Sequence, residues 1–252
     1  MKFAILAAGE GRRLREEGAA MPKPLTEING ETLIDRLIRI FNANGAKEIV
    51  VIVNDETDLV KRHIQNKYPT ILGNSTDIST RQDLQKLATV RLVTKTTPSS
   101  MHSFFEISKY LEDSKFCLTT VDTIFNESDF HEYIEAWNRS DVDGLMAVTP
   151  FIDDEKPLYV SVNNSMEITG FHDSLSTSAD GCKYVSGGIY GLTPKCISTL
   201  KHCIAANMSR MRNFQRQMVS DGLKLMAYPF QTILDVDHIG DVAKATQFLE
   251  RQ

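Results

Sequence analysis

Two glycines and several cations follow a short apolar stretch at the start of the sequence. Met1–Ile5 has the length and composition of a buried strand, and Gly9 and Gly11 come shortly after it. Glycine has no Cβ, so such a loop lets backbone N–H groups approach an anion closely. Three basic side chains of types that suit phosphate oxygens accompany the loop: Arg12, Arg13 and Lys23. The stretch therefore predicts a triphosphate cradle at the carboxyl end of a first strand.

The glycine pair alone leaves a second interpretation open. A strand followed by a glycine-rich turn also occurs as simple packing in α/β domains. The dinucleotide fingerprint G-x-G-x-x-G fails because Leu14 stands where the third glycine belongs. The Walker pattern G-x-x-x-x-G-K-[ST] fails too. The function of the loop must therefore be judged from a longer stretch of sequence.

The longer stretch resembles a known signature. L-A-A-G-x-G-x-R-L covers Leu6 to Leu14, and P-K-P-L follows at Pro22 to Leu25. This order is similar to that of the sugar-1-phosphate nucleotidylyltransferases and their relatives, which have the MobA-like NTP transferase fold. The resemblance implies that Arg13 and Lys23 stabilise the phosphates during transfer and are the catalytic residues. It also implies a set of nucleotide-binding residues in this segment: Leu6, Ala7, Ala8, Gly9, Gly11, Arg12, Arg13 and Lys23.

Two serines precede a predicted helix that follows the strand Val90–Val93. Ser99 or Ser100 is a natural N-cap for this helix, which is expected to run to about Glu112. Capping alone would explain both serines. The resemblance implies a different role, because relatives recognise the nucleotide base at the start of this helix. Ser99 and Ser100 are therefore also candidate nucleotide-binding residues.

Three aspartates follow predicted strands. Asp122 comes after Phe116–Val121, at the kind of strand end where open α/β sheets bind ligands, although Asp is also common in turns. Asp235 and Asp237 alternate along a later strand, so both are expected to point the same way. The resemblance implies that Asp122, Asp235 and Asp237 bind Mg²⁺, which would clamp the triphosphate. A cap or turn role for Asp237 is the alternative.

A glycine-rich strand in the second half is the other strong point of resemblance. Tyr184–Leu192 matches a G-x-Y-like strand whose glycine lets the sugar approach the backbone in relatives. The resemblance therefore implies that Gly187, Gly188 and Tyr190 bind the acceptor. The alternative is a strand kinked for packing, since glycine within a strand often marks a bulge.

The elements that must position these residues alternate along the chain. Helices predicted over Glu31–Asn44 and Glu56–Asn66 flank the strand Ile49–Val53, which indicates crossovers and a parallel sheet. Tyr68–Asp83 is a predicted polar loop, and Leu158–Phe171 has the pattern of an antiparallel hairpin. We expect an α/β fold, a three-layer α/β/α sandwich with a mostly parallel, Rossmann-like mixed sheet. Residues 1–252 would form one domain, with nucleotide bound in the N-terminal half and acceptor in the C-terminal half.

Composition limits the class of protein. The 252 residues carry a net charge of −5, which argues against a nucleic-acid-binding surface, and 42% of them are hydrophobic. The four cysteines form no C-x-x-C pair, so we expect a reducing, cytoplasmic setting. No apolar run approaches the roughly 18 residues of a membrane span, and no signal peptide precedes the first strand. We therefore expect neither nucleic acid nor membrane as a partner.

The resemblance implies a reaction and leaves its acceptor open. A nucleotidyl group would move from a nucleoside triphosphate to a phosphorylated small molecule, and pyrophosphate would leave. A hexose 1-phosphate is the first expectation. A cytidylyltransferase acting on phosphocholine or another small phosphorylated alcohol is the alternative, and a molybdopterin-type acceptor is less favoured. A non-catalytic nucleotide-sensing subunit on the same fold is another alternative. Relatives are often oligomeric, so a homo-oligomer is also expected.

Overall fold

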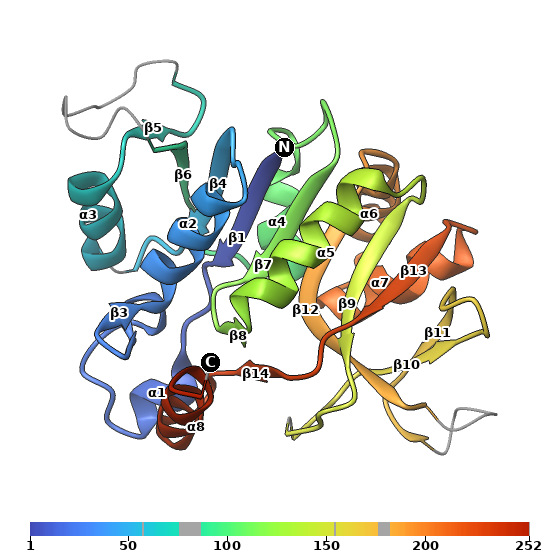
Figure 1. Ribbon diagram of the computed structural model, residues 1–252. Helices are drawn as coiled ribbons and strands as arrows, with labels where there is room; N and C mark the ends of the chain where they lie inside the picture. The colour runs from blue at the N-terminus through green and yellow to red at the C-terminus, as the bar shows by residue number, and fades with distance from the viewer. Residues whose placement is uncertain (57, 76–86, 154, 176–181, 252) are drawn as a thin grey trace.

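A mixed central sheet organises the molecule (Figure 1). The structure is a computed structural model that describes residues 1–56, 58–75, 87–153, 155–175 and 182–251. The strands in these ranges are β1 (Lys2–Ala7), β2 (Glu27–Ile28), β3 (Glu31–Thr32), β4 (Glu48–Val53), β5 (Thr70–Leu72), β6 (Thr89–Thr94), β7 (Phe116–Thr120), β8 (Thr123–Phe125), β9 (Gly144–Thr149), β10 (Tyr159–Val162), β11 (Ile168–His172), β12 (Tyr184–Leu192), β13 (Leu225–Pro229) and β14 (Ile233–Asp235). Neighbours in the main sheet follow the order β11-β10-β12-β7-β1-β4-β6-β5, and β9 links β12 to β13.

Strand direction divides the main sheet into two parts. The strands β7, β1, β4, β6 and β5 pair in parallel, and β13 also runs parallel to β9. β12 runs antiparallel to β7, β9 and β10, and β10 and β11 form the predicted antiparallel hairpin. Parallel strands covered on both faces are apolar throughout, which explains the continuous apolar runs of β1 and β4. The predicted mostly parallel, mixed sheet is confirmed.

Helices cover both faces of the sheet. They are α1 (Arg12–Glu16), the 3₁₀ turn η1 (Lys23–Leu25), α2 (Leu33–Ala43), α3 (Asp58–Lys67), α4 (Ser100–Ser108), α5 (Glu127–Arg139), α6 (Lys195–Ala205), α7 (Met211–Ser220) and α8 (Ile239–Leu249). Alternate residues of β1 belong to different cores, since Ile5 packs in the cluster that contains α2 and α5 while Leu6 packs with α4 and α6. The α/β fold is therefore the predicted three-layer sandwich.

The second helix shows how local sequence sets an element's ends. α2 begins later than the predicted Glu31, because Glu31–Thr32 forms β3 instead. The Thr32 hydroxyl then accepts a hydrogen bond from the Asp35 N–H at 3.2 Å, which caps the first turn. Gly45 follows the C-cap with a φ of 72°, so the predicted stop at Asn44-Gly45 is confirmed.

Two other predicted boundaries need correction. The predicted loop Tyr68–Asp83 contains a strand, β5, which pairs in parallel with β6 at the sheet edge. Its three residues are too few for periodicity to reveal, and residues 76–83 of the predicted loop lie outside the described residues. α4 ends at Ser108 rather than near Glu112. No helix in the part of the chain that the structure describes is long and apolar enough to cross a membrane.

Candidate functional site

The glycine-rich loop lies where two parallel strands end side by side. β1 and β7 pair in register up to Leu6 and Thr120, and the Val121 N–H donates to the Leu6 carbonyl at 3.1 Å. The loop that follows β1 therefore lies beside Asp122, which follows β7. This is the carboxyl edge of the sheet, the place where open α/β sheets bind ligands.

Gly11 allows the two halves of the first motif to approach each other. Its φ is 57°, in the left-handed region that glycine enters without steric cost. A Cβ on Gly11 would lie 2.8 Å from the Cβ of Lys23. Any other residue would therefore force η1, which carries Lys23, away from the loop. Gly9 has no atom within 4 Å of an added Cβ, so packing does not require glycine there.

Lys23 joins two aspartates that are far apart in the sequence. Its Nζ donates to Asp122 Oδ2 and, at 2.6 Å, to Asp237 Oδ1. The Arg13 guanidinium donates to the other oxygen of Asp237 at 2.7 Å. The Lys23 side chain is 9% exposed. Burial by itself would lower the pKa of Lys23, but the charges of Asp122 and Asp237 outweigh it and raise this pKa.

Asp122 is kept ionised by its contact with Lys23. Burial would raise the pKa of Asp122, but the adjacent charge of Lys23 lowers it below its usual range. Three sequence motifs thus meet at one cluster of charges: the glycine-rich loop, the end of β7 and the segment after β14. The cluster joins residues more than 200 positions apart.

A cavity of about 490 Å³ opens beside this cluster. Most predicted nucleotide-binding residues line it: Leu6, Ala8, Gly9, Gly11, Arg12, Arg13, Lys23, Ser99 and Ser100. Ala7 does not line it, because its side chain points to the opposite core and is 3% exposed. The lining also includes Thr96, Thr97 and Thr120, which sequence reasoning did not single out. The only signal for these threonines was their position, since Thr96 and Thr97 follow one predicted strand and Thr120 lies near the end of another.

Ser99 is the N-cap residue of α4 but does not use its side chain as a cap. Its Oγ lies 2.9 Å from His102 Nδ1 and accepts a hydrogen bond from the Arg210 N–H at 3.2 Å. Ser100 is the first residue of the helix. The simple capping interpretation therefore fails for the Ser99 side chain, and both serines face the cavity beside the glycine-rich loop.

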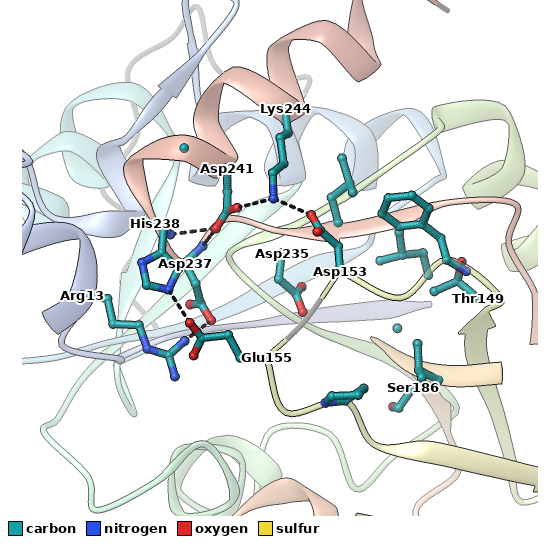
Figure 2. A pocket seen from close by; sticks show the side chains of 17 residues that line it. Arg13, Thr149, Asp153, Glu155, Ser186, Asp235, Asp237, His238, Asp241 and Lys244 are labelled. Atoms are coloured by element: carbon teal, nitrogen blue, oxygen red, sulfur yellow. Dashed lines mark hydrogen bonds and ion pairs between the residues drawn. The ribbon is translucent and has the colours of Figure 1, made fainter. Parts of the chain in front are cut away.

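A second cavity, of about 360 Å³, adjoins the first (Figure 2). Arg13 and Asp237 line both cavities and therefore stand at their junction. The second cavity lies between α8 and the strands β9, β12 and β14. The predicted Arg13, Asp235 and Asp237 line it. Its other polar side chains, which were not predicted as site residues, are Thr149, Asp153, Glu155, Ser186, His238, Asp241 and Lys244.

The predicted acceptor residues of β12 are only partly at this cavity. Gly187 lines it, whereas Gly188 and Tyr190 line neither of the two cavities. Gly188 has a φ of 72° at a register shift between β12 and β9, which is the bulge of the alternative interpretation. A Cβ on Gly187 would lie 2.2 Å from Ile233 Cδ1 and 3.3 Å from the Ala147 carbonyl oxygen, so this glycine lies in close contact with β14 and β9. Tyr190 is 5% exposed, and burial raises its pKa.

The three predicted metal-binding aspartates do not form one group. Asp235 ends β14, which pairs antiparallel with β8, and Asp237 lies beyond the strand. The two residues therefore do not lie on one strand, although both line the second cavity. Asp235 lines the second cavity only, whereas Asp122 lines the first. Among the described residues, no group of three or more His, Cys, Asp or Glu side chains is arranged to hold a metal ion.

Asp122 and Asp237 nevertheless suit a small cation. An oxygen of each carboxylate lies within hydrogen-bond distance of the same ammonium group, so the two can close around one positive charge. Oxygen donors are those that Mg²⁺ prefers, and Mg²⁺ is commonly held by one or two carboxylates together with substrate phosphates. The chemistry of this pair therefore fits the implied metal.

Two carboxylates hold the backbone around Asp237. Asp241 Oδ2 accepts hydrogen bonds from the N–H groups of Asp237, at 3.1 Å, and His238, at 2.8 Å. Glu17 accepts a hydrogen bond from the Ile239 N–H at 2.8 Å and pairs with the His238 ring. Asp241 was detectable as the third residue after the cap of α8. Glu17 was not, because its partners are more than 220 positions away.

Comparisons with known proteins identify the family and several similar proteins. The model of a family described as MobA-like NTP transferase domain matches residues 3–169, which is more than half of the chain. The chain is 25% identical over 207 residues to the probable glucose-1-phosphate cytidylyltransferase of Bacillus subtilis (strain 168), covering 79% of this chain and 78% of that protein. It is 22% identical to the UTP–glucose-1-phosphate uridylyltransferase AglF of Haloferax volcanii, covering 100% of this chain and 98% of that one.

A solved structure supports the fold. The inositol-1-phosphate CTP transferase from T. maritima superposes with a TM-score of 0.77 and 21% sequence identity, covering 99% of this chain and 95% of that one. At this level of identity the likeness establishes the fold and its order of elements. The chemistry must be argued from the residues of this chain.

Proposed function

We propose that this protein moves a nucleotidyl group onto a sugar 1-phosphate. The chain belongs to the MobA-like NTP transferase domain family and is a nucleotidyltransferase. The products are a nucleoside-diphosphate sugar and pyrophosphate. The observation that carries the proposal is the pair of adjoining cavities with Arg13 and Asp237 at their junction. A reaction between two bound phosphates requires such a junction.

The first cavity suits the nucleoside triphosphate. Its wall combines the glycine-rich loop and Lys23 with the start of α4, where Ser99 and Ser100 stand near the base in this proposal. Lys23 then exchanges its carboxylate partners for phosphate oxygens when the nucleotide binds. Arg13, whose planar guanidinium suits phosphate, faces the same triphosphate. Relatives named for CTP, UTP and glucose 1-phosphate support this assignment of substrates.

The transfer itself needs positioning and neutralisation of charge. An acceptor phosphate oxygen attacks the α-phosphorus in line, and a new P–O bond forms. The bond from the α-phosphorus to its bridging oxygen breaks, and pyrophosphate leaves with the electron pair. Arg13 and Lys23 stabilise the negative charge that gathers on the transferring and leaving phosphates.

Asp122 and Asp237 are the proposed Mg²⁺ ligands. When bound, Mg²⁺ would neutralise charge on the phosphates between them. Asp235 is left out of this set because it lines only the acceptor cavity. We place the reaction in the cytoplasm, which the free thiols of the four cysteines support.

The proposal is tested by pyrophosphate release with Mg²⁺. The four nucleoside triphosphates are crossed with hexose 1-phosphates, inositol 1-phosphate and phosphocholine. We expect release that needs one nucleotide and one sugar phosphate together, with CTP tested first because of the B. subtilis relative. Release with phosphocholine alone would support the alternative acceptor. Nucleotide binding without release from any pair would contradict the proposal and favour the sensing subunit.

A further inference from the structure

A pair of threonine hydroxyl groups closes the turn that carries Asp122. Thr120 ends β7 and Thr123 begins β8, with Val121 and Asp122 between them. The two Oγ1 atoms lie 2.7 Å apart, which is hydrogen-bond distance. Thr123 is 1% exposed, whereas Thr120 lines the first cavity beside Asp122. This hydroxyl pair, Thr120 and Thr123, therefore joins the two strand ends on either side of the turn.

The hydroxyl pair also reaches the carboxylate of Asp122. Burial raises the pKa of Asp122, whereas the charge and hydrogen bond of Lys23, followed by a hydrogen bond from the Thr120 hydroxyl, lower it. A threonine hydroxyl has one proton, so a Thr120 that donates to Asp122 must accept from Thr123. The hydrogen bonds therefore run from Thr123 to Thr120 and from Thr120 to the carboxylate.

The glycine bulge of β12 packs against the hydroxyl pair. Gly188 has a φ of 72°, and an added Cβ would lie 3.1 Å from Thr123 Oγ1 and 3.3 Å from Thr120 Oγ1. At these distances the hydroxyl groups would have to shift by a few tenths of an ångström. The backbone of the turn is held from a third element, because the Val236 N–H donates to the Asp122 carbonyl at 3.1 Å. The missing side chain of Gly188 therefore leaves room for the hydroxyl pair, although this glycine lines neither of the two cavities.

We infer, resting on the proposed function, that the hydroxyl pair positions the Asp122 carboxylate and that Gly188 keeps the space the pair occupies. In the proposed reaction Lys23 leaves Asp122 for the phosphates, so Lys23 no longer fixes the direction of this carboxylate. Thr120 and Thr123 remain, and they act as positioning residues that hold Asp122 toward Mg²⁺. Loss of a group that orients a metal ligand through a hydrogen bond typically costs about 10–100-fold in metal affinity or activity.

Thr120→Val tests the hydroxyl, because valine has the shape of threonine and cannot donate a hydrogen bond. Calorimetric titration of Mg²⁺ into the full chain loaded with a non-hydrolysable nucleotide analogue measures metal binding without turnover. We expect the Kd for Mg²⁺ to rise about tenfold in Thr120→Val and to stay near the wild-type value in Thr120→Ser, which keeps the hydroxyl. Equal Kd values in wild type and Thr120→Val, or an equal rise in Thr120→Ser, would overturn the inference.

Thr199→Val is the matched control for the loss of a buried hydroxyl. Thr199 on α6 is buried, and its hydroxyl donates to Asp221 Oδ2 at 2.6 Å, away from both cavities. We expect both valine variants to melt at a lower temperature than wild type and only Thr120→Val to bind Mg²⁺ more weakly. The same loss of Mg²⁺ affinity in Thr199→Val would trace the effect to general stability and overturn the inference.

Gly188→Ala tests the bulge while both hydroxyl groups are kept. Gly222→Ala is its control, because Gly222 has a φ of 73° and no atom within 4 Å of an added Cβ. Both variants carry the strain of a left-handed residue with a side chain. We expect the Kd for Mg²⁺ to rise in Gly188→Ala alone, and equal Kd values in the two alanine variants would overturn the part assigned to Gly188.

Pyrophosphate release separates failure of this inference from failure of the proposed function. A wild type that binds Mg²⁺ more tightly than Thr120→Val, yet releases no pyrophosphate with any acceptor, would contradict the proposed reaction and leave the inference standing. A wild type that turns over a sugar 1-phosphate, while Thr120→Val binds Mg²⁺ equally well, would overturn the inference alone. A wild type that binds the nucleotide analogue but no Mg²⁺ would also overturn it.

Discussion

At the scale of single residues, the site depends on a few side chains that cannot be exchanged. Lys23 holds Asp122 and Asp237 together, and Arg13 adds a second contact to Asp237. Gly11 matters for a different reason, because its missing side chain leaves room for Lys23. The site therefore depends on the charges of Lys23 and its partners and on the missing side chain of Gly11.

Loss of the Asp122 carboxylate should lower turnover. Asp122→Asn removes a proposed Mg²⁺ ligand and one partner of Lys23. We expect kcat to fall by roughly 10²–10³-fold, since metal stabilisation of phosphoryl charge contributes several kcal/mol. The measurement is pyrophosphate release over a Mg²⁺ titration, with the melting temperature as a check on folding. Asp58→Asn, an exposed control, should leave both unchanged. A folded Asp122→Asn protein with full activity would contradict the metal assignment.

Substitution of Gly11 should separate conformation from contact. Gly11→Ala places a methyl group 2.8 Å from Lys23 Cβ in a residue with a φ of 57°. Gly18→Ala has a φ of 97° but no atom within 4 Å of the added Cβ, so it controls for backbone strain alone. The left-handed conformation costs about 1–2 kcal/mol in each variant, which urea unfolding will measure. Only Gly11→Ala should also raise the KM for nucleotide, by roughly tenfold. Equal KM values in the two variants would contradict the steric role.

At the scale of elements, a buried carboxylate ties two helices together. Asp35 on α2 accepts hydrogen bonds from Tyr68 Oη at 2.6 Å and Lys67 Nζ at 2.8 Å. His63 Nε2 on α3 lies 2.9 Å from the same carboxylate. Burial would raise the pKa of Asp35, but these partners together lower it to about 2. These contacts anchor α3 to α2, and both helices pack into the same hydrophobic core on one face of the sheet.

This carboxylate should make stability depend on pH in the acid range. The folded-state pKa of about 2 lies below the usual aspartate pKa of 3.8, so the unfolded chain takes up the proton first as pH falls. The contribution, about 2 kcal/mol, is complete above roughly pH 5 and is lost as pH falls toward 2. Urea unfolding should therefore show the advantage of wild type over Asp35→Asn shrinking by about half between pH 6 and pH 3. A difference in unfolding free energy between wild type and Asp35→Asn that does not change with pH would contradict the assignment. The control Asp58→Asn should differ from wild type by the same amount at both pH values.

At the scale of the whole molecule, the beginning and the end of the chain build the site together. α1 and α8 lie side by side below the sheet edge (Figure 1), and Glu17 links them through the Ile239 N–H and His238. This link fixes the segment that carries Asp237, which pairs with Arg13 and Lys23 from the N-terminal half. The junction of the two cavities therefore forms only when the N-terminal and C-terminal segments of the chain come together.

Loosening that link should affect turnover more than folding. Glu17→Gln weakens the hold on α8 and lets Asp237 move relative to Arg13. We expect kcat to fall about tenfold, because small displacements of reacting groups are costly, while the free energy of unfolding changes little. Glu16→Gln, at the last residue of α1 and directly before Glu17, is the matched control. An unchanged kcat in Glu17→Gln, measured by pyrophosphate release, would show that Asp237 is positioned without this residue.

Local sequence was sufficient for the parts of this protein that depend on neighbouring residues. The apolar runs of β1 and β4 and the stop at Asn44-Gly45 follow from periodicity and backbone freedom over short spans. The placement of Asp122 at a strand end was also predictable, because a strand and its terminus are local features. The α/β class follows from their alternation along the chain.

The tertiary structure decided what depends on residues distant in sequence. Asp235 and Asp237 were predicted to share a strand face, but β14 pairs with β8 and ends at Asp235. Both residues line the second cavity, and only Asp237 also lines the first. Tyr190 and Gly188 were placed at the acceptor by pattern, yet one is buried and the other forms a bulge. Pairing register, the bridge from Glu17 to α8 and the junction of the two cavities arise only when separate segments meet. No local pattern of residues encodes those distances.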